Sequence, residues 1–167
     1  VMVWDGKGTR ALTRLKSELG QPMWNLGTRT FVTTGPDSLV ASCEIDDKAA
    51  LVIVSVLSAR RTQLEIRPIA GTSVGSLSAY DGRLATTVGR AKAPAALVAI
   101  RGRTKTPAIL RTASDLTLDA ANVSVGRTVS SRGGARKTTF PQYYPPASAS
   151  HRGPRGSLPP ALVLAHG

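Results

Sequence analysis

Cysteine and histidine are scarce in this sequence of 167 residues, and their scarcity excludes several classes of site. Cys43 is the single cysteine, so no disulfide bond can form within the chain. The two histidines, His151 and His166, lie too far from Cys43 in the sequence to match a familiar zinc-binding spacing. We therefore expect neither a bound metal ion nor a cofactor.

Long apolar runs are also missing. No stretch of about 18 apolar residues is present, and the N-terminal residues have neither a basic start nor a long apolar segment. We therefore expect no transmembrane helix, no signal peptide, no membrane partner and a cytoplasmic location. The first residue is Val1 and not Met, which fits a fragment of a longer chain. Aromatic residues account for only 4%, so a core would consist mainly of Val, Leu, Ile and Ala.

Carboxylates are absent from the last part of the sequence. All ten Asp and Glu residues lie at or before Asp119, and the net charge is +12. Such an excess suggests a polyanionic partner. The Arg and Lys residues of 120–167 are scattered, however, and have no interleaved aromatic stacking partners. We expect no specific nucleic-acid partner, and a stand-alone basic β-rich protein that binds nucleic acid or another polyanion is kept as the alternative.

Short β-prone segments follow one another between residues 22 and 110, separated by turn sequences. The first four are 22–32, 39–45, 50–57 and 63–66. The second four are 75–80, 83–89, 95–100 and 107–110. The turn sequences include Asp46-Asp47 and Asp81-Gly82. The pattern predicts a mainly β fold with two sets of four strands.

The two sets repeat at a fixed interval. Residues 39–41 align with 84–86, and residues 51–54 align with 96–99, each at an offset of 45 residues. A four-strand unit that repeats every 40 to 45 residues or so is typical of a β-propeller blade. We expect a partial β-propeller of about two four-stranded blades, with residues 1–15 as the end of a preceding blade. An antiparallel sandwich whose strand spacing coincides by chance is the alternative.

The repeat does not continue beyond this region. Residues 122–130 and 135–144 flank a Gly-rich turn and predict a hairpin, whereas 145–160 has the composition of a loop. Ala161 to Ala165 is a short apolar run, typical of a strand that is buried on both faces of a sheet. We place a domain boundary between residues 112 and 122.

One motif suggests a catalytic serine. Gly71-Thr72-Ser73-Val74-Gly75 matches the G-x-S-x-G nucleophile pattern, in which the serine occupies a sharp turn between a strand and a helix. The residues that follow it predict another strand and no helix, and the next histidine is His151. We therefore interpret Ser73 as part of a loop between two blades and not as a nucleophile.

Other noticeable residues have structural interpretations. Trp24 and Tyr80 are expected to pack within the blades, and Cys43 alternates with apolar neighbours and is expected in the core. The Asp46-Asp47 pair fits a solvated hairpin turn, and His151 lies in a polar loop where we expect it to be exposed. No pair of carboxylates has a spacing that indicates acid–base catalysis.

The end of the chain resembles the junction between propeller and hydrolase in the prolyl oligopeptidase family of serine peptidases, especially its bacterial dipeptidyl and acylaminoacyl peptidase-like members. The matching residues, in order, are Gly133-Gly134, Phe140, Tyr143-Tyr144-Pro145-Pro146, Gly153-Pro154, Gly156, Leu158-Pro159-Pro160 and His166-Gly167. Upstream, Pro22, Trp24 and Gly27, and also Ser114-Asp115-Leu116, are similar to the last blades of such propellers. The segment 131–139 is more basic than is usual in the family.

The resemblance implies a domain organisation and a function. Residues 1–118 would be C-terminal blades of a β-propeller, and residues 119–167 would hold the interdomain connection and the first strands of a truncated α/β-hydrolase domain. The intact protein would hydrolyse oligopeptides, with the propeller restricting access to the active site. The partner would be a peptide substrate; nothing indicates an oligomeric state.

The same resemblance assigns the site. His166 and Gly167 would lie on the strand whose end helps to form the oxyanion hole. The serine, aspartate and histidine of the triad follow that strand in such chains, and so would lie beyond residue 167. His166 would then not be the triad base, and this chain alone would hold no catalytic residue and be inactive.

Overall fold

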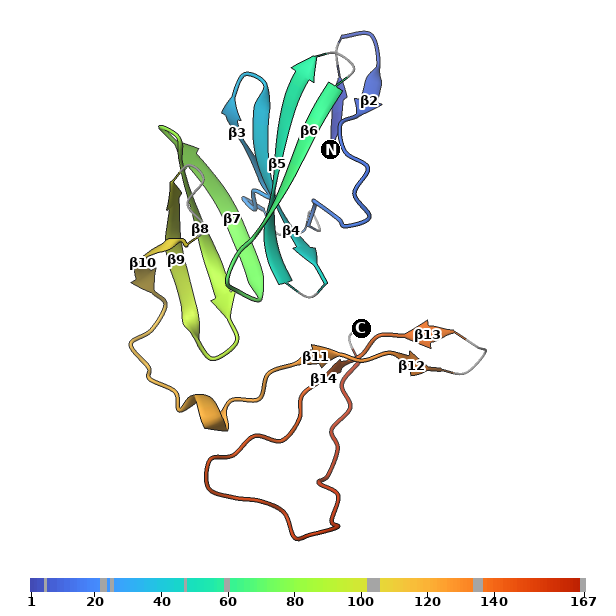
Figure 1. Cartoon of the computed structure of the whole chain (residues 1–167), viewed down its shortest axis with the longest axis vertical. Coiled ribbons are helices and arrows are strands. Elements are labelled where there is room, and N and C mark those ends of the chain that lie inside the picture. The colour runs from blue at the N-terminus through green and yellow to red at the C-terminus, as the bar shows by residue number, and fades with distance from the viewer. Residues whose placement is uncertain are drawn as a thin grey trace. The chain divides into compact units, whose positions relative to one another are not determined.

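The computed structural model describes residues 1–4, 6–21, 24, 26–46, 48–58, 61–101, 106–133 and 137–165 (Figure 1). The chain divides into two compact units, Val1–Leu116 and Thr117–Gly167. Strands dominate the first unit, whereas the second has four strands of two residues each, and the one helical element in the described part is a short 3-10 turn, η1 (Ala120–Asn122). The expectation of a mainly β fold is therefore confirmed.

Two four-stranded antiparallel sheets form most of the first unit, and in each the chain passes from one strand to its neighbour. The first sheet has the order β3 (Phe31–Gly35), β4 (Ser38–Ile45), β5 (Lys48–Ser58), β6 (Arg61–Pro68). The second has the order β7 (Ser73–Tyr80), β8 (Arg83–Arg90), β9 (Ala93–Arg101), β10 (Ala108–Thr112). Two sets of four strands are present as predicted (Figure 1), but the first strand lies at Phe31–Gly35 and not at residues 22–32, whose described residues before Phe31 form no strand.

Tight turns connect neighbouring strands where the sequence predicts them. Asp81 and Gly82 link β7 to β8 with positive φ angles of 47° and 68°. Two successive positive φ angles are the feature of a type I′ turn, whose twist matches that of the flanking strands. Asp46 has a φ of 50° between β4 and β5, as expected for an Asp in a hairpin turn, whereas Asp47 lies outside the described residues.

The first sheet is buried on both faces because its central strand is apolar on both. Along β5, Ala49 and Leu51 belong to a core that includes residues of the second sheet. The alternate residues Val52 and Val54 belong to another core, formed with Leu12 and other residues of the N-terminal segment. Successive side chains of a strand point to opposite faces, so one strand contributes to both cores.

The N-terminal segment covers the first sheet with a small antiparallel pair of strands. These are β1 (Met2–Trp4) and β2 (Thr9–Ala11), and Val1 and Val3 pack against the core around Val52. The N-terminal segment thus covers the part of the first sheet around Val52 and Val54.

The structural repeat differs from the sequence alignment in one strand. A register shift between Val88 and Arg90 places two residues of β9, Pro94 and Ala95, opposite one residue of β8, so β9 carries one additional residue. In the first sheet Leu39 pairs with Val54, and in the second sheet the equivalent residue Leu84 pairs with Ile100. The offset is therefore 45 residues for β4 and β8 but 46 for β5 and β9. The alignment of residues 51–54 with 96–99 was wrong by one position, because a β-bulge leaves little trace in the sequence.

The two sheets meet along β7. The backbone NH of Leu77 donates to the carbonyl of Arg29 at 2.9 Å, and the NH of Arg29 donates to the Ser76 hydroxyl at 3.2 Å. The connection after β6 is held by the NH of Ile69, which donates to Ala49 at 2.9 Å. Neither sheet closes on itself within the described residues.

The second unit consists of short strands and a long loop. The strands β11 (Arg127–Thr128) and β14 (Gln142–Tyr143) pair with each other, and β12 (Ser131–Arg132) pairs with β13 (Thr138–Thr139). The predicted hairpin is thus confirmed. No residue of this unit that the structure describes is fully buried.

The predicted strand at Ala161 to Ala165 is not formed. These residues have no strand partner among the described residues, and Leu162, Val163 and Leu164 are 84%, 88% and 83% exposed. A buried strand requires hydrogen-bonded neighbours on both edges and cover on both faces, and the described chain supplies neither here. The first strands of an α/β-hydrolase domain are accordingly not seen.

Candidate functional site

The two positions assigned to the oxyanion strand cannot be placed. His166 and Gly167 both lie outside the described residues. The residues that lead to them are exposed and extended, with Leu158 93% exposed. Their assignment therefore stays a prediction from the resemblance.

The G-x-S-x-G motif is explained by strand packing. Ser73 begins β7, which continues to Tyr80 as a strand, so the turn from strand to helix that a nucleophile elbow requires is absent. A Cβ atom on Gly71 would lie 2.2 Å from Cγ1 of Val88. A Cβ atom on Gly75 would lie 2.1 Å from Oγ1 of Thr87. Both glycines are therefore required by the close approach of β8, and the interpretation of Ser73 as a structural residue agrees with this geometry.

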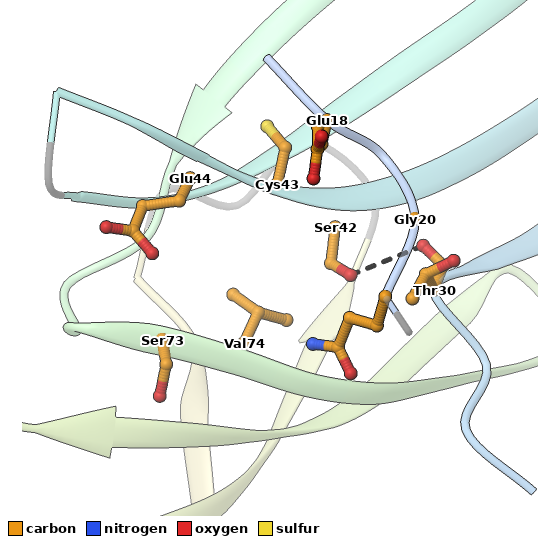
Figure 2. Close-up of a pocket in the computed structure, with 9 residues that line it drawn as sticks. Glu18, Gly20, Thr30, Ser42, Cys43, Glu44, Ser73 and Val74 are labelled. Atoms are coloured by element: carbon orange, nitrogen blue, oxygen red, sulfur yellow. Dashed lines mark hydrogen bonds between the residues drawn. The ribbon is translucent and has the colours of Figure 1, made fainter. Parts of the chain in front are cut away.

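A cavity of about 300 Å³ in the first unit brings several polar side chains together (Figure 2). It lies between β4, β7 and the segment that precedes β3. The lining residues are Glu18, Gly20, Gln21, Thr30, Ser42, Cys43, Glu44, Ser73 and Val74. The Ser42 hydroxyl donates to the carbonyl of Thr30 at 3.3 Å, as Figure 2 shows, and the Ser42 NH donates to the same oxygen at 2.8 Å.

The chemistry of this cavity is that of a polar recess and not of a catalytic centre. Burial raises the pKa of the Cys43 thiol, so the thiol stays protonated and weakly nucleophilic at neutral pH. The residues that line it include no histidine or lysine that could act as a base for Ser42 or Ser73. The carboxylates of Glu18 and Glu44 are exposed to solvent. The arrangement can accept hydrogen bonds but lacks an activated nucleophile.

The remaining predicted positions have mixed outcomes. Trp24 and Tyr80 are 81% and 86% exposed, so the expectation that they pack within the sheets was wrong. Tyr80 is the last residue of β7, beside the turn, where no other strand covers it. Cys43 packs against the Val52 core but is only partly buried. His151 is exposed, as expected.

One contact between an arginine and an aromatic ring was missed in the sequence. The guanidinium of Arg127 lies 5.4 Å from the centre of the Tyr143 ring, and the two residues are directly opposite each other on β11 and β14. The distance is that of a cation–π contact. The sequence signal was present in the hairpin pattern, but the interpretation that no basic residue of this region has an aromatic partner overlooked pairing across strands.

The described residues contain neither a candidate metal site nor a candidate membrane-spanning helix. They contain no group of three or more His, Cys, Asp and Glu side chains that could hold a metal ion. They also contain no helix with the length and apolar character needed to cross a bilayer.

Comparison with known proteins identifies structural relatives only. No family model and no curated protein sequence matches the chain. Among solved structures, a puromycin-hydrolyzing peptidase of Mycobacterium tuberculosis is similar with a TM-score of 0.80 and 21% identity, and covers 94% of this chain. Puromycin hydrolase is similar with a TM-score of 0.76 and 19% identity over 92%. The chain spans 23–24% of the length of these proteins. At this level of identity the similarity establishes a shared fold, that of part of a puromycin-hydrolysing peptidase.

Proposed function

We propose that this chain is part of a serine peptidase of the prolyl oligopeptidase family that hydrolyses oligopeptides. The observation that carries the proposal is the similarity of 92–94% of the chain to one quarter of two puromycin-hydrolysing enzymes. Puromycin contains an aminoacyl amide bond, so the known reaction of these relatives belongs to the same class as peptide hydrolysis. The motif that ends in His166-Gly167 supports the proposal independently.

The two sheets would be adjacent blades of a propeller. The repeat supports this, because the face of the second sheet that carries Leu84 packs toward the first sheet. The equivalent face of the first sheet, which carries Leu39, packs toward the N-terminal segment. Each sheet thus presents the same face to the element before it, as blades do in a radial array. In the intact enzyme this array would restrict entry to short peptides.

The chemistry would depend on residues that follow this chain. A serine activated by a histidine, itself oriented by an aspartate, would attack the scissile carbonyl and form an acyl-enzyme. The strand that carries His166 and Gly167 would help to supply hydrogen-bond donors for the oxyanion. Ser73, the serine of the G-x-S-x-G motif, begins a strand and so does not have the geometry of the nucleophile.

Extension of the chain tests the proposal. The reading frame should continue beyond Gly167 into a G-x-S-x-G motif between a strand and a helix, and the longer protein should release the amino acid from puromycin and aminoacyl anilides. Changing that serine to Ala should abolish the activity. A reading frame without the motif, or a longer protein without hydrolytic activity, would contradict the proposal.

The 167-residue chain supplies the matching control. We expect no hydrolysis of the same substrates above the uncatalysed rate, with or without the change Ser73→Ala. Activity that disappears in the Ser73→Ala variant would show that the nucleophile had been misassigned.

The polyanion-binding alternative has less structural support. One face of the Tyr143 ring, which could stack on a nucleobase, is already in contact with Arg127. We expect binding of the chain to a single-stranded oligonucleotide to be weak and to vanish at moderate salt, without sequence preference. Tight binding that persists at physiological salt would favour the alternative.

A further inference from the structure

The loop after β14 encloses a cavity that the proposed function does not use. Its volume is about 410 Å³, within the range of small-molecule sites. The lining residues are Pro146, Ala147, Ser148, His151, Arg152, Gly153, Ser157 and Pro159. All of them lie in the second unit, so the cavity is formed by one continuous segment.

Hydrogen bonds hold this loop in shape. The backbone NH of Ala149 donates to Oδ1 of Asn122 at 2.7 Å, which anchors the loop to η1. The Ser148 hydroxyl oxygen accepts from the NH of His151 at 3.0 Å. At the other end, the Ser157 hydroxyl donates to the carbonyl of Pro154 at 2.7 Å. The cavity is therefore a defined feature of the loop.

The cavity carries an uncompensated positive charge. Arg152 has no carboxylate partner within the described part of the chain, and no Asp or Glu follows Asp119 in the sequence. The Asp119 carboxylate is already engaged, since it accepts from the NH of Ala121 at 2.9 Å and from the Asn122 side chain at 3.3 Å. A free guanidinium in a recess favours an anionic ligand, which it can bind through two parallel hydrogen bonds.

Two further polar groups belong to this loop. Nδ1 of His151 lies 2.8 Å from the Ser150 hydroxyl; where the hydroxyl is the donor, Nε2 carries the ring proton and can donate to a ligand. The Ser148 oxygen accepts backbone hydrogen bonds, so its own proton is free to be donated. The lining also includes the apolar residues Pro146, Ala147 and Pro159.

We propose that this cavity binds a small organic carboxylate. Arg152, His151 and Ser148 would bind the carboxylate group, and the apolar body of the ligand would lie against Pro146 and Pro159. A few convergent polar groups beside an apolar wall are the usual composition of a small-molecule site. This site is a property of the loop and does not depend on the peptidase proposal.

Titration of the 167-residue chain with benzoate tests the site, with NMR detection of the His151 ring signals and calorimetry for the affinity. We expect the His151 signals to shift and benzoate to bind more tightly than acetate, because the ring adds apolar contact. Arg152→Ala should weaken binding about tenfold or more, since a hydrogen bond to a charged group contributes roughly 1.5–3 kcal/mol. Arg152 makes no hydrogen bond that shapes the loop, so this variant should retain the fold.

The matched control is Arg155→Ala, which removes the same charge from the same exposed loop but outside the cavity. It should leave the affinity unchanged. An equal loss of benzoate affinity in both variants would mean that the loop attracts anions only through its overall positive charge, and this would overturn the proposal. Equal binding of uncharged benzamide, or tighter binding of inorganic phosphate than of benzoate, would also overturn it, because the ligand class would then be wrong.

Discussion

At the scale of single residues, the glycines beside β8 illustrate how closely the strands of the first unit approach. A Cβ atom on Gly71 would be 2.2 Å from the side chain of Val88 and 2.7 Å from the carbonyl oxygen of Gly89. Because the second contact is with backbone, it cannot be relieved by a side-chain rotation. We expect Gly71→Ala to lower the free energy of unfolding by about 1–3 kcal/mol. Urea unfolding followed by circular dichroism measures the change.

Gly20→Ala is the control for this variant. A Cβ atom on Gly20 would meet nothing within 4 Å, and we expect its unfolding midpoint to match that of the original chain. Equal destabilisation in the two variants would mean that the loss arises from the backbone preference of glycine and not from the contact with β8.

Because of Cys43, we expect the free energy of unfolding of the first unit to depend on pH in the alkaline range. Burial raises the pKa of its thiol above the ordinary value of 9.0, so the folded chain favours the neutral thiol. The unfolded chain loses the proton first as the pH rises. The stabilisation from this group is therefore complete below pH 9.0 and is lost as the pH rises through the raised pKa.

Comparison with Cys43→Ala isolates this effect from the titration of Lys and Tyr. The difference in unfolding free energy between the two proteins should be constant up to about pH 8 and should shrink above the ordinary thiol pKa. A difference that stays constant to pH 10 or so would show that the thiol titrates equally in both states.

At the scale of elements, the repeat allows two equivalent leucines to be compared. Leu51 on β5 and Leu97 on β9 occupy matching positions once the extra residue of β9 is counted. Leu51 is fully buried between the sheets, whereas Leu97 is 40% exposed on the far face of the second sheet. We expect Leu51→Ala to cost about 2–5 kcal/mol and Leu97→Ala less than about 1 kcal/mol.

Thermal or urea unfolding of the two variants measures this asymmetry. Similar losses for Leu51→Ala and Leu97→Ala would mean that the far face of the second sheet is covered in solution, for example by self-association. Sedimentation of the original chain would then reveal the larger species.

The strands and turns were predictable because their causes are local. Asp81 and Gly82 adopt positive φ angles because both residue types tolerate that conformation in a tight turn. The continuous apolar run of β5 likewise indicates burial of the strand on both faces. The bulge in β9 and the exposure of Trp24 depend on neighbours distant in sequence, and neither was foreseen.

The candidate sites likewise divide into features that local sequence determines and features that depend on distant residues. Ser73 could be rejected as a nucleophile from its local context alone, because the expected strand after it replaces the required helix. The cavity beside Arg152 could not be anticipated, since it depends on how the loop folds back onto Asn122. The apolar run around Val163 predicted a strand that is not formed, because the described chain supplies no neighbours for it.

At the scale of the whole molecule, the two units differ in the basis of their stability. The first contains two apolar cores that include Leu51, Val52 and Leu77, all fully buried. The second has no fully buried residue in its described part, and it depends on short hairpin pairings and on side-chain contacts to its loop. Such a unit gains little from apolar burial, so it should open at a much lower free energy.

Hydrogen exchange measured along the whole chain tests this difference. We expect the amides of the central strands β5, β8 and β9 to exchange more slowly by orders of magnitude than those of residues 145–165, because only the former must await global opening. The amides of Leu162, Val163 and Leu164 should exchange at nearly the rate of an unstructured peptide, since they have no strand partner. If these three amides are instead protected as strongly as those of β5, the segment pairs as a strand in solution, and the expectation from its apolar sequence was right.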